Sequence, residues 1–113
     1  MLDHAWIEEF PVSATVTDLE GTIIAMNAKS VATFEADGGS KLIGKSVFDC
    51  HSPKSQEKLR EMFKSKSSNI YTIEKKGVKK LIYQSPWYQN GEFAGIVELS
   101  LEIPFEMPHF IRD

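Results

Sequence analysis

The sequence predicts an α+β domain whose five antiparallel strands form one sheet covered by helices. Residues 12–26 and 70–103 are rich in β-branched and aromatic residues and are divided by turn signals such as Asn90-Gly91. Residues 27–65 carry helix caps and helical spacing instead. Two strands, several short helices, one longer helix and three strands therefore follow one another, and the helices must cover one face of the sheet.

Length and charge limit the kind of protein. The chain has 113 residues, 13 Lys and Arg against 16 Asp and Glu, and one Cys. This length fits one domain, and the slight acidity argues against a nucleic-acid partner. One Cys excludes an intramolecular disulfide, and no apolar run reaches the roughly 20 residues of a membrane span. We expect a cytoplasmic domain with no membrane or nucleic-acid partner.

Residues 1–11 predict a short amphipathic helix. Leu2, Trp6 and Phe10 are spaced four apart and therefore share one helical face, and Pro11 ends the helix. This face either forms a dimer interface or folds onto its own domain.

The next elements follow from local signals. Residues 12–17 alternate between apolar and polar side chains, and residues 22–26 form a second β-rich run, so the two predict a hairpin. Asn27 is the expected N-cap of a short helix. Ser52 followed by Pro53 predicts the start of the longest helix, because Pro fits the first helical position.

The last third predicts three strands, over residues 70–74, 78–87 and 93–103, followed by a tail over 104–113. Asn90-Gly91 is a strong hairpin signal. Pro104 and Pro108 exclude an unbroken helix after the last strand. Alternation in that strand places two sets of residues on opposite faces: Phe93, Gly95, Val97, Leu99 and Leu101, and Ile96, Glu98, Ser100 and Glu102.

This order of elements resembles the PAS domain, a sensory module of similar length, over residues 12–103. The resemblance rests on Thr17-Asp18-Leu19-Glu20-Gly21-Thr22-Ile23, on residues 42–48 and on the closing hairpin over residues 89–98. Cys50-His51-Ser52-Pro53 is similar to a sub-group of PAS modules with Cys-His-Pro before the long helix.

The resemblance implies a small-molecule pocket between the inner sheet face and the short helices. Tyr83 and Ser85 are the expected polar groups of this pocket, although the same side chains would also suit a plain core. The expected lining is Met26, Phe34, Phe48, Cys50, His51, Met62, Phe63, Tyr71, Tyr83, Ser85 and Val97.

The resemblance also raises the question of a cofactor. Some PAS domains hold haem through one His near the long helix, so His51 is the candidate axial ligand and the only candidate metal ligand. The alternatives are that His51 caps the helix, faces solvent or hydrogen-bonds another ligand. Flavin is not expected, because His51 follows Cys50 where a basic-aromatic pair would be needed. Adjacent side chains point in different directions, so Cys50 and His51 do not predict an enzyme.

PAS domains commonly dimerise by laying an N-terminal helix across the outer sheet face, which would explain the surplus of large apolar residues. The expected interface residues are Leu2, Trp6, Phe10, Ile24, Ile82, Trp87 and Ile96.

The resulting hypothesis is a homodimeric PAS sensor that binds a small ligand and signals through a separate protein. One alternative is a ligand-free platform for protein–protein interaction or dimerisation, and another is a haem-binding gas or redox sensor. Many PAS domains continue into a helical lever, but here Glu102-Ile103-Pro104 departs from that pattern. We therefore expect the signal to pass by contact with a partner or by self-association.

Overall fold

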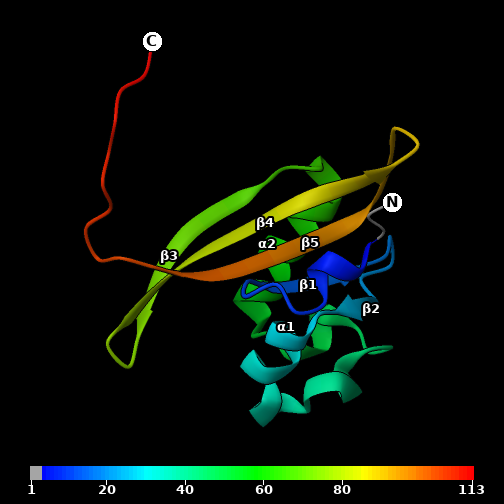
Figure 1. Ribbon diagram of the computed structural model, residues 1–113. Coiled ribbons are helices and arrows are strands. Elements are labelled where there is room, and N and C mark those ends of the chain that lie inside the picture. The colour runs from blue at the N-terminus through cyan, green and yellow to red at the C-terminus, as the bar shows by residue number, and fades with distance from the viewer. Residues whose placement is uncertain (1–3) are drawn as a thin grey trace.

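The computed structural model describes residues 4–113, apart from the side chain of Cys50, and forms one antiparallel sheet (Figure 1). The strand order is β2-β1-β5-β4-β3. The strands are β1 (Ser13–Thr17), β2 (Ile23–Met26), β3 (Asn69–Lys75), β4 (Val78–Gln89) and β5 (Glu92–Ile103). The predicted five-stranded α+β fold is confirmed.

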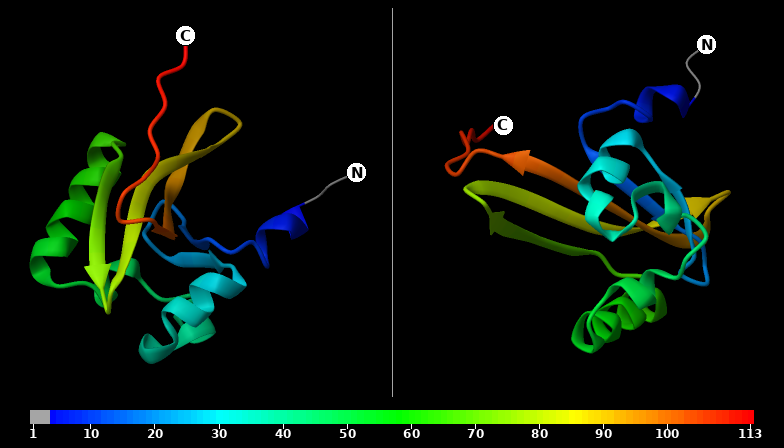
Figure 2. Two further views of the ribbon diagram at one scale, coloured as in Figure 1. Left: turned by 60° about the vertical axis from the view of Figure 1, so that its left-hand side comes forward. Right: turned by 90° about the horizontal axis from the view of Figure 1, so that it is seen from below.

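The helices divide into two groups along the sheet. Figure 2 shows α2 (Pro53–Ser65) beside β3 and β4, and the short helical segments beside β1 and β2. The short segments are α1 (Ala28–Thr33) and four 3-10 helices, η1 (His4–Ile7), η2 (Glu35–Asp37), η3 (Gly39–Leu42) and η4 (Val47–Cys50). Among the described residues no helix is long and apolar enough to cross a membrane.

The predicted helix starts and hairpin are confirmed. The side chain of Asn27 accepts from the N–H of Ser30 and caps α1, and Ser52 caps α2 with Pro53 at its first turn. Asn90 and Gly91 both have positive φ, of 54° and 81°, as a type I′ turn requires.

Asn27 also joins three parts of the chain. Its Oδ1 accepts from the N–H of Ala14 at 3.0 Å, and its Nδ2 donates to the carbonyls of Ile7 at 2.9 Å and Val12 at 2.8 Å. A buried amide with all these partners is satisfied, and it fixes the N-terminal segment, β1 and α1 relative to one another.

These bonds explain a difference at the N-terminus. Instead of one helix up to Phe10, the described part of this segment has only the single 3-10 helix η1. The carbonyl of Ile7 is held by Asn27, and the carbonyl of Glu8 accepts from the N–H of Ala28 at 2.9 Å. The segment is therefore tied to α1 by its backbone, while Leu2 lies outside the described residues.

The core consists of two apolar clusters under the sheet. Ile23, Met26 and Leu42 pack beneath the short helices. Leu59 and Met62 of α2 pack against Ile96 of β5, and Met62 is fully buried.

A β-bulge in β5 decides which side chains face this core. Gly95 pairs with Trp87 and Phe93 with Tyr88, which leaves Ala94 without a partner on β4. Phe93 therefore packs with the α2 cluster together with Ile96. The expectation that Phe93 shares the face of Val97 is wrong, because strict alternation does not hold across a bulge.

Gly95 lies directly against the backbone of β1. It has φ of +146°, and a Cβ at this position would collide with the carbonyl of Thr17 and lie 2.8 Å from that of Asp18. The same Thr17 carbonyl accepts from Nε1 of Trp87 at 2.8 Å. Only glycine fits at this crossing of β1 and β5.

We predict that Gly95→Ala lowers the free energy of unfolding by about 3 kcal/mol or more, because backbone atoms must move to admit the methyl group. Gly44→Ala is the matched control. Its φ is also positive, at +95°, but its Cβ would meet no atom within 4 Å. The control should therefore lose only the roughly 1–2 kcal/mol of left-handed backbone strain. Chemical denaturation measures both, and equal losses would contradict the collision.

Candidate functional site

The candidate site is a small cavity of about 30 Å³ between the sheet and α2. This volume holds about two water molecules. Its walls come from β1, β4 and β5 on one side and from η4, α2 and His51 on the other. The lining residues are Thr15, Thr17, Val47, His51, Leu59, Phe63, Gln84, Ile96 and Glu98.

His51 also lines two larger hollows. One is a cleft of about 550 Å³ under the short helices, lined in part by Met26 and Phe34. The other is a groove of about 570 Å³ between α2 and the end of the sheet, lined in part by Tyr71 and Gln84. His51 lines the cavity, the cleft and the groove, so it borders all three spaces.

The ring of His51 has a defined hydrogen bond. Its Nδ1 lies 2.7 Å from the carbonyl oxygen of Val47. Because a carbonyl only accepts, we assign the proton of the neutral ring to Nδ1, which leaves Nε2 as an acceptor. The backbone carbonyl of His51 accepts from Gln56 at 2.9 Å, which fixes the start of α2.

The inner sheet face beside His51 is polar. Asn69 donates to Oε1 of Gln84 at 3.0 Å, and Nε2 of Gln84 donates to the carboxylate of Glu98 at 2.7 Å. This chain of bonds fixes the orientation of the Gln84 amide. It also directs a carboxylate into the cavity.

Tyr71 lies near the same carboxylate. Partial burial, and secondly the negative charge of Glu98, raise the pKa of the Tyr71 phenol above its ordinary value. The negative charge of Glu98 therefore acts on the Tyr71 phenol.

Seven of the eleven predicted pocket residues line the cavity, the cleft or the groove or belong to the core. Phe63 lines the cavity with His51, Met26 and Phe34 line the cleft, and Tyr71 lines the groove. Phe48 and Met62 belong to the core, with the Phe48 ring 5.7 Å from that of Phe63. The side chain of Cys50 lies outside the description.

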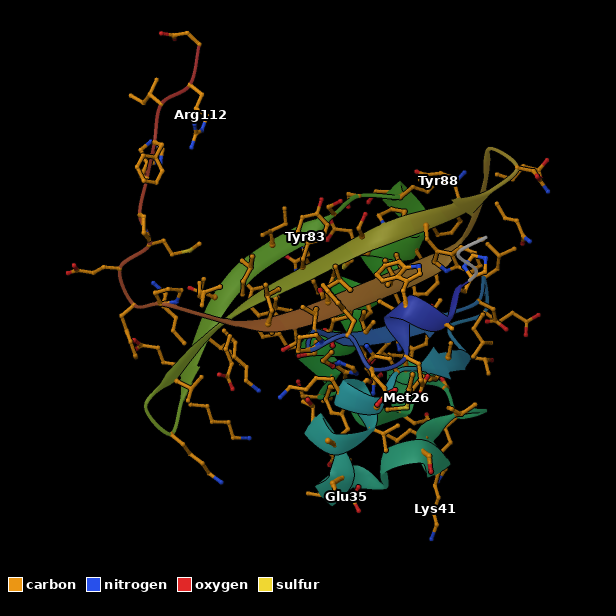
Figure 3. All side chains as sticks on the ribbon, viewed as in Figure 1. Met26, Glu35, Lys41, Tyr83, Tyr88 and Arg112 are labelled. Atoms are coloured by element: carbon orange, nitrogen blue, oxygen red, sulfur yellow. The ribbon has the colours of Figure 1, made fainter. Side chains whose placement is uncertain are left out.

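Three predicted lining residues are on the wrong face. Tyr83 pairs with Leu99 and Ser85 with Val97, whereas Gln84 and Glu98 face the cavity between them. Successive side chains of a strand point to opposite faces, so Tyr83, Ser85 and Val97 face outward. Figure 3 shows Tyr83 along β4, away from the short helices around Met26.

Two predicted interface residues are also wrong. Ile82 and Ile96 are buried, with exposures of 6% and 4%, and Ile96 packs against α2. Both residues lie on the inner side of the sheet, two positions along their strands from Gln84 and Glu98 respectively.

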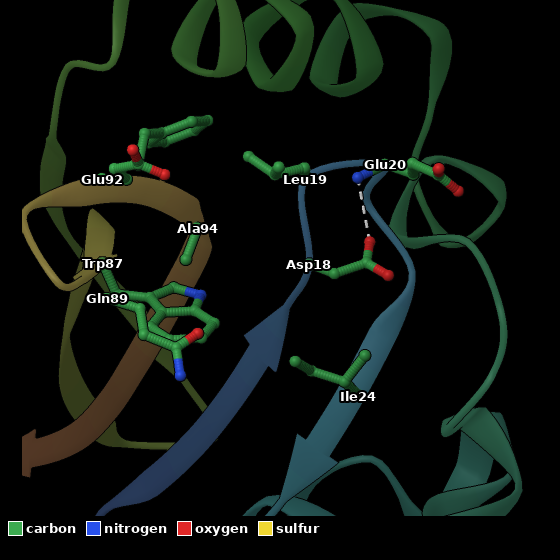
Figure 4. Close-up of a pocket in the computed structure, with 9 residues that line it drawn as sticks. Asp18, Leu19, Glu20, Ile24, Trp87, Gln89, Glu92 and Ala94 are labelled. Atoms are coloured by element: carbon green, nitrogen blue, oxygen red, sulfur yellow. Dashed lines mark hydrogen bonds between the residues drawn. The ribbon is translucent and has the colours of Figure 1, made fainter.

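The other predicted interface residues lie outside the core. Trp6, Phe10 and Ile24 are exposed, and Trp87 is half-buried. Trp87 and Ile24 line an open hollow of about 480 Å³ at one end of the sheet, beside the turn at Asp18 (Figure 4).

The sequence prediction missed Thr15, Gln84 and Glu98. Thr15 belongs to the polar half of the alternation in β1, which faces inward although that half is normally exposed. Gln84 and Glu98 would have been found by pairing β4 with β5 in the observed register. Among the described residues no group of three His, Cys, Asp or Glu side chains is placed to hold a metal ion.

The sequence matches no protein-family model and no curated protein. Solved structures show the fold. A C-terminal domain from Streptococcus mutans has a TM-score of 0.70 and 16% identity, over 85% of this chain and 78% of its own. The PAS domain of a protein from Colwellia psychrerythraea has a TM-score of 0.63 and 21% identity, over 87% and 91%.

The third comparison is with the Aer2 receptor of Vibrio cholerae, described as a dual PAS-heme oxygen sensor. Its TM-score is 0.61 and its identity 13%, over 82% of this chain and 95% of that one. The chain therefore has the PAS fold, as the sequence resemblance implied.

We predict that Glu98→Gln lowers the pKa of Tyr71 toward, but not to, the ordinary value of about 10. The phenolate is negative, so removing the Glu98 charge favours it, while the contribution of burial remains. Absorbance titration of the phenolate, with Tyr71→Phe to assign the signal, measures this pKa. Glu102→Gln on the same strand is the control and should leave it unchanged. An unchanged or higher pKa in Glu98→Gln would contradict the proposed proximity.

Proposed function

We propose that this chain is a sensory module that binds a small polar molecule at the His51 cavity and signals by self-association or contact with a partner protein. The supporting observation is the polar inner face of the sheet, at which Thr15, Gln84 and Glu98 line the cavity. Thr15 and Gln84 are hydrogen-bonded to neighbouring side chains, so their burial costs little, and Glu98 brings to the cavity a carboxylate that a polar ligand can bind.

The adjoining spaces support binding. The cleft and the groove are both lined in part by His51, which places space for a molecule larger than the cavity next to it. A concave site with a few convergent polar groups is typical of small-molecule binding. The proposed role is binding and requires no catalytic step.

The residues around His51 do not fit a haem. The sheet wall beside His51 presents the Gln84 amide and the Glu98 carboxylate. An apolar macrocycle on His51 would cover these groups without offering hydrogen bonds. We therefore favour a polar ligand over haem.

Self-association is the second part of the proposal. Trp6 and Phe10 are 52% and 44% exposed, and their rings stack edge to face with centroids 5.8 Å apart. Rigid exposed aromatic side chains of this kind are enriched in protein interfaces. With Ile24 and Trp87 they define the proposed dimer surface, which we call the Trp6 surface.

The first test is an NMR screen of small cationic, neutral and anionic fragments. We predict that some fragments shift the backbone signals of Thr15, Gln84 and Ile96. This response should be lost in His51→Phe, because the larger ring fills space where His51 borders the cavity, the cleft and the groove. His109→Phe in the exposed tail is the matched control and should respond like the native chain.

A screen without any such shifts, or with equal shifts in His51→Phe, would favour a ligand-free interaction platform. A Soret band in the purified protein that disappears in His51→Ala would instead establish haem.

The second test is the native mass. We predict a mass twice that of one chain by light scattering, and a shift to monomer in Trp6→Ser, because the variant removes the most exposed aromatic ring of the Trp6 surface. Ile111→Ser, in the C-terminal tail, removes an apolar side chain that is 86% exposed and serves as the control. A monomeric native protein, or a Trp6→Ser dimer of unchanged affinity, would contradict the Trp6 surface.

A further inference from the structure

The hydrogen bonds inside the cavity limit what a ligand can offer. The hydroxyl of Thr15 is bonded to that of Ser30, and the hydroxyl of Thr17 is bonded to the backbone of Ile96. Both ends of the Gln84 amide are bonded, to Asn69 and to Glu98. These bonds leave one hydroxyl hydrogen of the Thr15–Ser30 pair and the second N–H of the Gln84 amide as the remaining donors of these groups.

The charged group of the cavity wall, the Glu98 carboxylate, is an acceptor, and so is one ring nitrogen of His51. Nε2 of His51 is an acceptor in the neutral ring, because Nδ1 donates to the carbonyl of Val47. The Glu98 carboxylate has four acceptor positions and one hydrogen bond, from Gln84. Among the described residues Glu98 has no Lys, Arg or His partner, although it is half-buried. A half-buried carboxylate without a cation favours a positively charged partner.

We propose that the ligand is a small organic cation with at least two N–H donors, such as a guanidinium, amidinium or primary ammonium group. One donor binds the Glu98 carboxylate and another binds Nε2 of His51. This inference rests on the proposed function and adds the ligand class to it.

The charged residues around the cavity also favour a cation beside Glu98. The groove residues contributed by β3 and β4, Asn69, Tyr71 and Gln84, include no cation. The two lysines that line the groove, Lys54 and Lys58, come from α2 and are exposed. At the rim of the cleft, Asp37 and Asp49 outnumber Lys45. Burial, and then the charge of Glu98, raise the pKa of the Tyr71 phenol, which agrees with a carboxylate near that side chain.

The dimensions limit the ligand further. A cavity of about 30 Å³ admits only a charged headgroup, and the remainder must lie in the cleft or the groove. We therefore infer a compact cationic head on a short, flexible or flat body.

The test compares three probes of similar shape by NMR titration: n-butylguanidinium, the neutral n-butylurea and the anionic n-valerate. We expect n-butylguanidinium to shift Thr15, Gln84 and Ile96 and to bind more tightly than the other two. In Glu98→Gln its affinity should fall about tenfold or more, as expected for a lost charge-assisted hydrogen bond.

Two controls make the test specific. Glu102→Gln removes an exposed carboxylate from the same strand and should leave the affinity unchanged. Thermal unfolding establishes that Glu98→Gln is folded; if it is not, the ranking of the three probes on the native chain still decides.

The outcomes separate the two proposals. Binding of n-butylurea or n-valerate at the same residues, as tight as that of n-butylguanidinium, would overturn the cation and leave the proposed binding function intact. Equal affinity of n-butylguanidinium for Glu98→Gln and the native chain would also overturn the cation. If none of the three probes shifts the cavity residues, the cation is overturned, and the wider fragment screen decides whether the cavity binds any ligand.

Discussion

The close approach of Gly95 to the carbonyl of Thr17 is the constraint on which the site depends. This carbonyl also accepts from the Trp87 indole, so one oxygen fixes β1, β4 and β5 at their crossing. The adjacent bulge at Ala94 determines which residues of β5 face the helices and which face away from them. As a result Ile96 and Glu98 face the helices, and a different register would exchange the polar wall of the cavity for its apolar neighbours.

The sequence predicted the elements of the fold well, because short local motifs mark where these elements begin or end. Asn27, Ser52-Pro53 and Asn90-Gly91 mark a helix cap, a helix start and a hairpin whose geometry depends on neighbouring residues alone. His51 was likewise predicted at the pocket, and it borders all three spaces. The sequence predicted less well on which face of the sheet each strand side chain lies. This face depends on the unpaired residue in β5, and no local pattern reveals the partner that a residue lacks.

Most of the misplaced site residues were assigned to the wrong face of the sheet. Val97 was expected inside and Ile96 outside, and the structure exchanges them. The expected pocket was consequently mostly apolar, with Tyr83 and Ser85 as its polar groups beside His51, whereas the observed one combines His51 with the Gln84 amide and the Glu98 carboxylate. An apolar pocket would suit haem, and this one suits a polar molecule. A change of one residue in register thus changes the chemistry assigned to the whole cavity.

The buried amide of Asn27 has a mechanical consequence. It caps α1, whose C-cap residue Phe34 lines the cleft, and it holds the carbonyls of Ile7 and Val12. The helix and the segment bearing Trp6 therefore move as one body, or these bonds must break and leave buried polar atoms unpaired. Any displacement of α1 by an occupant of the cleft would reach the Trp6 surface through the Asn27 side chain and the backbone bond between Ala28 and Glu8, without a long helix to carry it.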